Sequence, residues 1–144
     1  MLRYMLDTDT CSYVMKRSNQ TVLKRLQQVR VNEVCISVIT KSELLFGVEI
    51  SPRRQQDDLA LSAFLGYVEV LDFPDEAASH YANIRAALQA RGTMIGANYL
   101  FIAAHARIDL RLVTNNTAEF GRVKAVRLEN WAAPARRPRA KGEE

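Results

Sequence analysis

Five short apolar runs, each separated from the next by a helical stretch, set the strongest limit on how this chain can fold. Short runs rich in β-branched and other apolar residues are typical of buried strands, and strands that alternate with helices favour a parallel sheet. The sequence therefore predicts an α/β domain with a short, mainly parallel central sheet. The predicted strands are 2–6, 33–37, 68–73, 110–116 and 125–131.

The segments between these strands carry the pattern of amphipathic helices. The clearest helix spans 75–92, which opens with acids, repeats apolar residues at helical spacing and ends at a glycine. The helix after the second strand places Ile39, Phe46 and Ile50 on one predicted face. Glu43 lies on the same face, where an ionised carboxylate is costly unless a cation or hydrogen bonds meet it.

Length and composition indicate one soluble domain. The chain has 144 residues, 48% of them hydrophobic and 25% charged, and it contains no apolar run of the roughly 18 residues that a membrane-spanning helix needs. Asp7 comes too early for a signal peptide, so we expect a cytoplasmic protein with no membrane association. Cys11 and Cys35 fit no metal-ligand spacing and are expected as reduced, buried thiols, with a disulfide as the less favoured alternative.

Acidic side chains follow three of the predicted strands. Asp7 comes directly after the first strand, with Asp9 two residues later. Glu43 lies on the helix after the second strand, and Glu119 lies in the turn after the fourth, close to Asn116. Each acid alone could be a helix cap, a solvated side chain or a surface turn residue. Because ligands bind at the carboxyl ends of parallel strands, the acids together predict a site at one edge of the sheet.

Metal-dependent phosphoryl transfer needs such a cluster. Carboxylates that hold one or two Mg²⁺ ions allow the metal to activate water and to stabilise charge on the phosphate. Thr114 and Asn116, after the fourth strand, could orient a water molecule or a metal-bound ligand. A metal-dependent phosphodiesterase is therefore one hypothesis beside the ordinary explanations.

Four segments carry a family resemblance: MLDTDTCSYVMK, VCISVITKSELLFGVE, IGANYLFIAAHA and LVTNNTAEFGRV…VRLENW. In this order they resemble the VapC toxins of bacterial toxin–antitoxin pairs, which are PIN-domain proteins. The resemblance runs from Met1 to Trp131, so it implies a PIN domain over 1–131 with an α/β/α sandwich around a short parallel sheet. It also implies a Mg²⁺- or Mn²⁺-dependent endoribonuclease that a VapB antitoxin holds silent.

The resemblance assigns roles to individual residues. Asp7 matches the first family acid and Glu43 the second. The third family acid, also a metal ligand, belongs to a GxND-type segment, here GANY, so its position is held by Tyr99. Asp9 stands where these toxins more often have Asn, and it could add an acid near the metal. The polar cluster after the fourth strand is matched by Thr114, Asn116 and Glu119.

A tyrosine cannot replace this aspartate chemically. Its unperturbed pKa is about 10, so the phenol is neutral at pH 7 and a poor ligand for Mg²⁺. The ring is also bulkier and is expected to fill part of the pocket. We therefore predict ribonuclease architecture with weakened or abolished activity. The alternative, that Tyr99 only packs beside Ile102, Ala103 and Ala106, is compatible with an inactive site.

The resemblance also implies a substrate and partners. Members that share LDT…CIS…TNN…ENW cut initiator tRNA in its anticodon stem-loop, so that RNA is the expected substrate. A homodimer is expected to bind VapB, which commonly inserts an Arg or Lys into the acidic pocket, and to join a larger assembly with operator DNA bound through the antitoxin. The alternative is a catalytically inactive binding protein that keeps antitoxin binding and co-repression of its operon. Direct DNA binding is disfavoured because the chain contains no helix-turn-helix signature.

Positive charge is modest overall and is concentrated near the end of the chain. The net charge of +4 supports an anionic partner without requiring one. Residues 132–144 are predicted to form a basic, disordered tail that is either solvated or an electrostatic contact for nucleic acid or a partner. Its basic residues are Arg136, Arg137, Arg139 and Lys141. Three helical arginines are candidate phosphate contacts or ordinary exposed-face residues: Arg85, Arg91 and Arg107.

The two histidines and the tryptophan are expected to be structural. His105 lies on another face of the helix that carries Tyr99, and no Ser or Cys partner is evident in the sequence. His80 is expected to face solvent and to be inert. Trp131 is expected to pack against the domain and not to stack on RNA.

Overall fold

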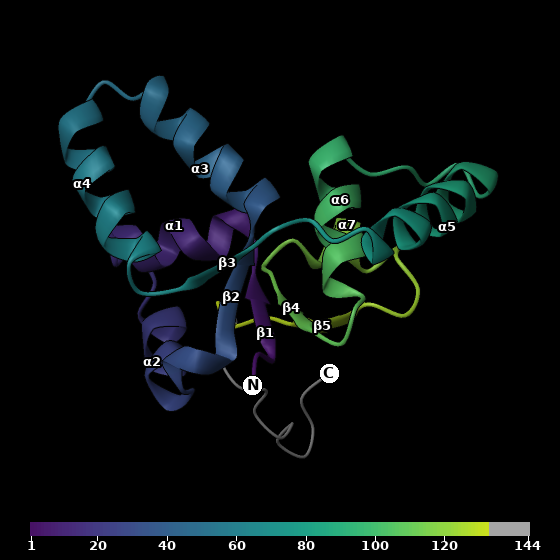
Figure 1. Ribbon diagram of the computed structural model, residues 1–144, viewed down its shortest axis with the longest axis horizontal. Coiled ribbons are helices and arrows are strands. Elements are labelled where there is room, and N and C mark those ends of the chain that lie inside the picture. The colour runs from purple at the N-terminus through teal and green to yellow at the C-terminus, as the bar shows by residue number, and fades with distance from the viewer. Residues whose placement is uncertain (133–144) are drawn as a thin grey trace, which may run out of the picture.

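The computed structural model describes residues 1–132, which form a five-stranded sheet with seven α-helices around it (Figure 1). The strands are β1 (Tyr4–Leu6), β2 (Val34–Ser37), β3 (Glu69–Leu71), β4 (Arg111–Val113) and β5 (Arg127–Glu129). The helices are α1 (Thr8–Lys16), α2 (Gln20–Gln28), α3 (Val38–Glu49), α4 (Arg54–Leu65), α5 (Glu76–Ala90), α6 (Ala97–Ala106) and α7 (Thr117–Phe120), with a 3₁₀ turn η1 (Val31–Glu33) before β2. The basic residues of the predicted tail lie outside the described residues.

The sheet has the strand order β3-β2-β1-β4-β5, and all of its strand pairs are parallel. This confirms the predicted parallel sheet. The strands are shorter than the predicted runs because their flanking residues leave the ladder to form turns and caps. The fourth run, for example, ends at Val113, since the N–H of Asn116 donates to Thr114 Oγ1 at the start of α7.

The central strands β1 and β2 are buried on both faces, which explains why they are mostly apolar, whereas the edge strands β3 and β5 each begin with an exposed charged residue. Tyr4 and Leu6 belong to one apolar cluster, whereas Met5 between them belongs to a second cluster on the opposite face. Helices α1 to α4 supply side chains to the first cluster, and α5 to α7 supply the second. The three layers in Figure 1 therefore form the predicted α/β/α sandwich.

Two sequence expectations about the chain's general character can be compared with the structure. Cys11 and Cys35 are free, buried thiols, as predicted. Within residues 1–132, no helix is long and apolar enough to span a membrane.

The buried face of α3 differs from the predicted one. Phe46 and Ile50 are 63% and 67% exposed, and the helix instead buries Thr40, Leu44 and Val48. The predicted stripe was wrong because α3 carries apolar residues around most of its circumference. Helical spacing alone therefore could not select the side that faces the sheet.

Helix α5 projects from the body of the molecule (Figure 1). Its bounds are close to the predicted 75–92, but only Ala77, Ile84 and Leu88 of its fifteen residues are buried. Gly92 follows the helix with a φ of 65°, a left-handed conformation that favours glycine. This helix therefore has much less contact with the core than α6, whose ten residues include six buried ones.

Candidate active site

The strand order reverses direction at β1. The chain runs outward from β1 through β2 to β3, and it then returns to place β4 on the other side of β1. Connections that leave the two neighbouring strands diverge to opposite faces, which opens a crevice at the carboxyl ends of β1 and β4. Asp7 follows β1 and Thr114 follows β4, so both lie at this crevice.

Asp7 is held at the crevice by backbone and side-chain hydrogen bonds. Its N–H donates to the carbonyl of Val113 at 3.0 Å, which continues the β1–β4 ladder. Its Oδ1 accepts from the N–H of Thr10 at 2.9 Å and caps α1. The residue is only 4% exposed, so its carboxylate has a defined position within the fold.

Burial raises the pKa of the Asp7 carboxyl above its ordinary value of 3.8. The hydroxyl of Thr114 and the N–H of Thr10 lower this pKa by hydrogen bonding, without cancelling the effect of burial. The negative charge of Asp9 acts in the same direction as burial. The ionised form of Asp7 would therefore gain from a cation in the crevice.

Glu43 enters the site from α3. Thr8 Oγ1, on the residue after Asp7, donates to Glu43 Oε1 at 2.6 Å. This hydrogen bond joins the end of β1 to the helix that follows β2. The carboxylate is half-buried and beside the exposed Phe46, so it does not lie along a core-facing apolar face. Sequence reasoning missed Thr8, because the DTDT segment indicates helix capping but not a partner 35 residues away.

Asn116 and Glu119 lie where β4 gives way to α7. Asn116 Oδ1 accepts from the N–H of Glu119 at 3.4 Å and caps this one-turn helix, so Glu119 is helical and not in a turn as predicted. An Asn that accepts from the residue three positions later favours helix initiation, which explains the difference. Glu119 Oε2 is buried and has no hydrogen-bond partner within residues 1–132. A buried carboxylate oxygen without a hydrogen bond would be stabilised by a cation or by a hydrogen-bond donor.

Tyr99 lies on the first turn of α6 and packs toward α7. Its ring makes an edge-on contact with Phe120, with ring centroids 5.2 Å apart. It also covers Gly96, where an added Cβ would lie 3.3 Å from Tyr99 Cδ2. The ring therefore packs against both Phe120 and Gly96. Its expected neighbours Ile102 and Ala103 are buried in the core.

The hydroxyl of Tyr99 belongs to the acid cluster. Burial raises the pKa of this phenol above 10, and the negative charge of Asp9 raises it further. A hydrogen bond with Asn116 lowers the pKa, while Glu119 and Glu43 raise it by their charge. The phenol is consequently neutral at pH 7. The structure thus brings the predicted site residues to one crevice.

These residues do not fit a firmly held divalent metal ion. Within the described part of the chain, no three Asp, Glu, His or Cys side chains are placed to hold a metal. Asp7 and Glu43 reach the crevice, and the third side chain beside them is the neutral phenol of Tyr99, which is a poor ligand for a hard divalent cation. The unpaired oxygen of Glu119 favours a cation without completing the set. Binding of Mg²⁺ or Mn²⁺ in this crevice stays a prediction.

A family model described as the PIN domain matches residues 4–126. Ribonuclease VapC2 of Haemophilus influenzae is 43% identical to this chain over 132 residues, which are 91% of this chain and 99% of that protein. The chain belongs to the VapC family of PIN-domain proteins.

Further VapC relatives match over nearly their whole length. The tRNA(fMet)-specific endonuclease VapC of Salmonella typhimurium is 38% identical, with 91% of this chain and 99% of that protein covered. The crystal structure of DNA-bound VapBC from Salmonella typhimurium gives a TM-score of 0.86 at 38% identity, with 91% of this chain and 99% of that chain covered. The resemblance to VapC toxins seen in four sequence segments is thereby confirmed.

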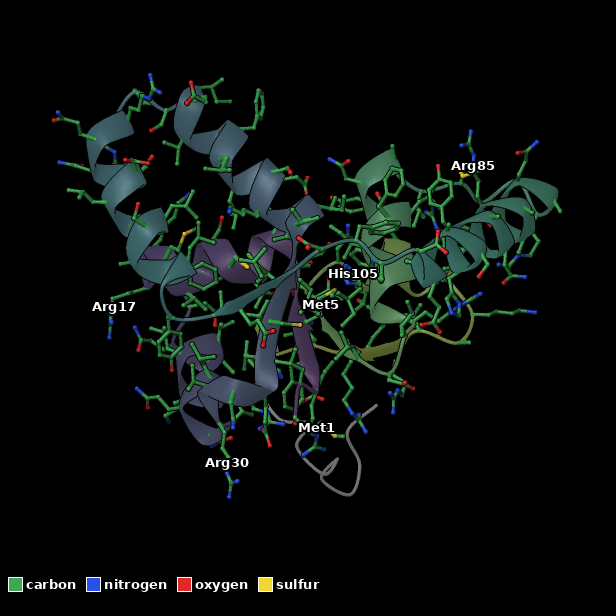
Figure 2. The ribbon with its side chains drawn as sticks, viewed as in Figure 1. Met1, Met5, Arg17, Arg30, Arg85 and His105 are labelled. Carbon is green, nitrogen blue, oxygen red and sulfur yellow. The ribbon has the colours of Figure 1, made fainter. Side chains whose placement is uncertain are left out.

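His105 is buried in the core on the inner side of α6, and Figure 2 labels its place in the fold. Its Nδ1 is 2.9 Å from Ser37 Oγ, a serine partner that the sequence did not reveal. Ser37 Oγ also accepts from the N–H of Ile39 and caps α3. The contact between His105 and Ser37 therefore links α6 to the start of α3. The ring of His105 contacts that of Phe73 edge-on, and burial lowers the pKa of His105.

The helical arginines have protein partners. Arg107 Nε donates to His80 Nδ1 at 2.8 Å, so His80 joins α5 to the end of α6 and is half-buried, not solvent-facing as expected. This structural contact agrees with the expectation that His80 has no catalytic role. Arg91 Nη2 donates to the carbonyl of Arg122 at 3.0 Å. Arg85 is exposed and donates to the hydroxyl of Tyr81 on its own helix. These contacts agree with the second alternative given for the three arginines, that they are ordinary residues of exposed helix faces.

Proposed function

We propose that this chain is the toxin component of a VapBC-type pair, with the pocket of a site-specific endoribonuclease that Tyr99 weakens or silences. The observation that carries this proposal is the neutral phenol of Tyr99 among acids at the carboxyl ends of β1 and β4. The resemblance places a metal-binding aspartate at this position. Replacing it removes a charged oxygen ligand that a hard divalent cation prefers.

The remaining residues keep the framework of the pocket. Asp7 and Glu43 would be the principal acids of a Mg²⁺ or Mn²⁺ site, with Asp9 as an additional acid. Asn116 and Glu119 would orient polar groups beside them. The contacts of Tyr99 with Phe120 and Gly96 support a fixed position of the phenol beside these acids.

Tyr99→Asp is expected to restore cleavage. We propose initiator tRNA as the substrate because the Salmonella relative is a tRNA(fMet)-specific endonuclease. The rate in Mg²⁺ should rise by about 100-fold or more, since groups that only support metal ligands already contribute roughly 10–100-fold. Gel analysis of an end-labelled anticodon stem-loop, with and without chelator, measures the rate.

Tyr99→Phe is the matched control, because it keeps the ring and removes only the hydroxyl. It should cleave as slowly as the Tyr99 chain. If the Tyr99 chain and Tyr99→Asp cut the RNA equally fast, the role assigned to Tyr99 is wrong. Cleavage that persists in chelator would argue against dependence on a divalent metal.

The second candidate function is that of a catalytically inactive binding protein that retains antitoxin binding and co-repression of its operon. The DNA-bound VapBC complex of Salmonella typhimurium motivates it. We propose a cytoplasmic homodimer that binds a VapB-type antitoxin and joins a larger assembly, with operator DNA bound through the antitoxin. Calorimetric titration with VapB distinguishes the two functions: a tight complex, together with no cleavage by the free protein, favours the binding protein.

A further inference from the structure

Basic side chains gather between α2 and the edge strand β5, on the sheet face that α1 to α4 cover. We call Lys24, Arg25, Arg111 and Arg127 the basic patch. Arg111 and Arg127 are register partners on β4 and β5, so their side chains leave the sheet on the same face. The α2 residues Lys24 and Arg25 line a cavity together with Glu129, which lies two residues after Arg127 on the same face.

The carboxylate of Glu129 holds two arginines of the basic patch in place. Glu129 Oε1 accepts from Arg25 Nη2 at 2.8 Å, and Glu129 Oε2 is 3.8 Å from Arg111 Nη1. Trp131 Nε1 donates to the same Oε1 at 3.0 Å, and the guanidinium of Arg25 lies 5.6 Å from the centre of the indole ring. Arg25 and Arg111 nevertheless remain 36% and 42% exposed. Four basic groups and one carboxylate leave the patch with a charge of +3.

The cavity beside the basic patch has a volume of about 370 Å³. Thr21, Lys24 and Gln28 line it from one face of α2, and Asn130 lines it from the segment after β5. Ammonium, guanidinium, hydroxyl and amide groups are the donors that hold phosphate oxygens in nucleic-acid complexes. Trp131 is only 2% exposed, so this surface does not present the aromatic side chain that protein interfaces favour.

The position of the cavity relates it to the active-site crevice. Glu129 is the register partner of Val113, which in turn pairs with Leu6, the residue before Asp7. Two strand spacings, about 10 Å, therefore separate the end of β5 from the end of β1. A few nucleotides of RNA can cover that distance.

We propose that the basic patch binds phosphate groups of the RNA substrate next to the crevice. This inference rests on the proposed function, which supplies RNA as the ligand. Basic residues on an edge strand also prevent unwanted strand pairing, but that role concerns Arg127 and not the α2 residues Lys24 and Arg25. The contacts of Arg25 with Glu129 and Trp131 hold its guanidinium in place before a ligand arrives.

Salt-dependent binding of a fluorescein-labelled anticodon stem-loop RNA tests the proposal. Fluorescence anisotropy is measured in chelator for the full chain, for Lys24→Gln and Arg127→Gln, and for their double variant. Each single substitution should reduce the slope of log affinity against log salt by about 0.7–0.9 and weaken binding about five- to eightfold near 0.1 M salt. Arg54→Gln is the control, because it removes an exposed, ion-paired arginine on α4. Melting temperatures verify that every variant is folded.

Several outcomes would overturn the proposal. The parent chain could fail to bind the RNA, or the double variant could keep the parent's affinity and salt slope. Arg54→Gln could also lose as much RNA affinity as the patch variants. An equal loss with DNA of the same sequence would show a general nucleic-acid surface, and a loss confined to VapB binding would show a protein interface. The proposed function is tested separately, since it depends on whether Tyr99→Asp cleaves the RNA.

Discussion

Asp7 must accept a hydrogen bond as a helix cap, yet its buried position disfavours its charge. Asn caps helices as well as Asp does, and because it is neutral it does not carry the free-energy cost of a buried charge. Asp7→Asn is therefore expected to raise the melting temperature at pH 7 by about 2–4 °C, the shift that roughly 1 kcal/mol produces in a domain of this size. Scanning calorimetry in metal-free buffer measures it.

The pH dependence of this gain follows from the raised pKa of Asp7. The folded state binds the proton more tightly than the unfolded state, so the parent loses stability as pH rises from 3.8 through the raised native pKa. The advantage of Asp7→Asn should thus be complete above that native pKa and disappear below 3.8. Asp58→Asn, at an exposed position on α4, is the control for the same chemical change outside the core. A pH-independent gain would contradict the role given to burial.

At the residue scale, the sequence was sufficient to predict the residues that directly follow a strand. Asp7 and Thr114 could be selected because ligands bind at the carboxyl ends of parallel strands. The partners Thr8 and Ser37 could not, since their contacts with Glu43 and His105 join segments 35 and 68 residues apart. A hydroxyl contact between such distant segments produces no periodic pattern in the sequence, so it could not be predicted.

At the scale of single elements, two glycines should respond to the same substitution in opposite ways. Gly92 follows α5 with a φ of 65°, and the N–H of Thr93 donates to the carbonyl of Leu88 in a helix-ending motif. Gly92→Ala should cost about 1 kcal/mol, because an L side chain is strained there. Denaturant unfolding measures the change in free energy.

Gly47→Ala is the matched comparison within α3. An added Cβ at Gly47 would meet nothing within 4 Å, and the backbone there is already helical. The variant should therefore gain about 0.5–1 kcal/mol of unfolding free energy, since alanine loses less entropy in a helix than glycine. If both variants change stability in the same direction, the assigned backbone conformations are not the cause.

The elements show why helix positions were more predictable than helix faces. Capping residues and a terminal glycine mark where α5 begins and ends, and these signals are local. The buried face of α3 depends on which side meets the sheet, and its apolar residues Phe46, Ile50, Leu44 and Val48 surround the axis. Only tertiary packing distinguishes them.

At the scale of the whole molecule, α5 should be much less protected than the central strands. Three of its fifteen residues are buried, and Tyr81 stacks on Phe101 of α6 at 4.5 Å. Amides of α5 are expected to exchange with solvent at least about tenfold faster than those of β1 and β4, because local opening exposes little apolar surface. Hydrogen-exchange mass spectrometry measures this. Equal protection of α5 and the central strands would show that α5 opens only with the whole domain.

The parallel sheet was predictable at this scale, but its strand order was not. Alternating strands and helices indicate parallel pairing, yet several orders satisfy that pattern. Placing β4 beside β1 creates the crevice, and that choice depends on both layers of helices packing at once. The resemblance to VapC implied the α/β/α sandwich, but it supplied no prediction of the strand order.

The return of the chain to β1 has a consequence for protein synthesis. Asp7 and Glu43 are made early, whereas Tyr99 and Asn116 are made only after about two-thirds of the chain has been synthesised. A product released before α6 would contain the first acids without the residues that complete the crevice. In a gene whose intact pocket is harmful to its host, premature termination would therefore yield harmless fragments.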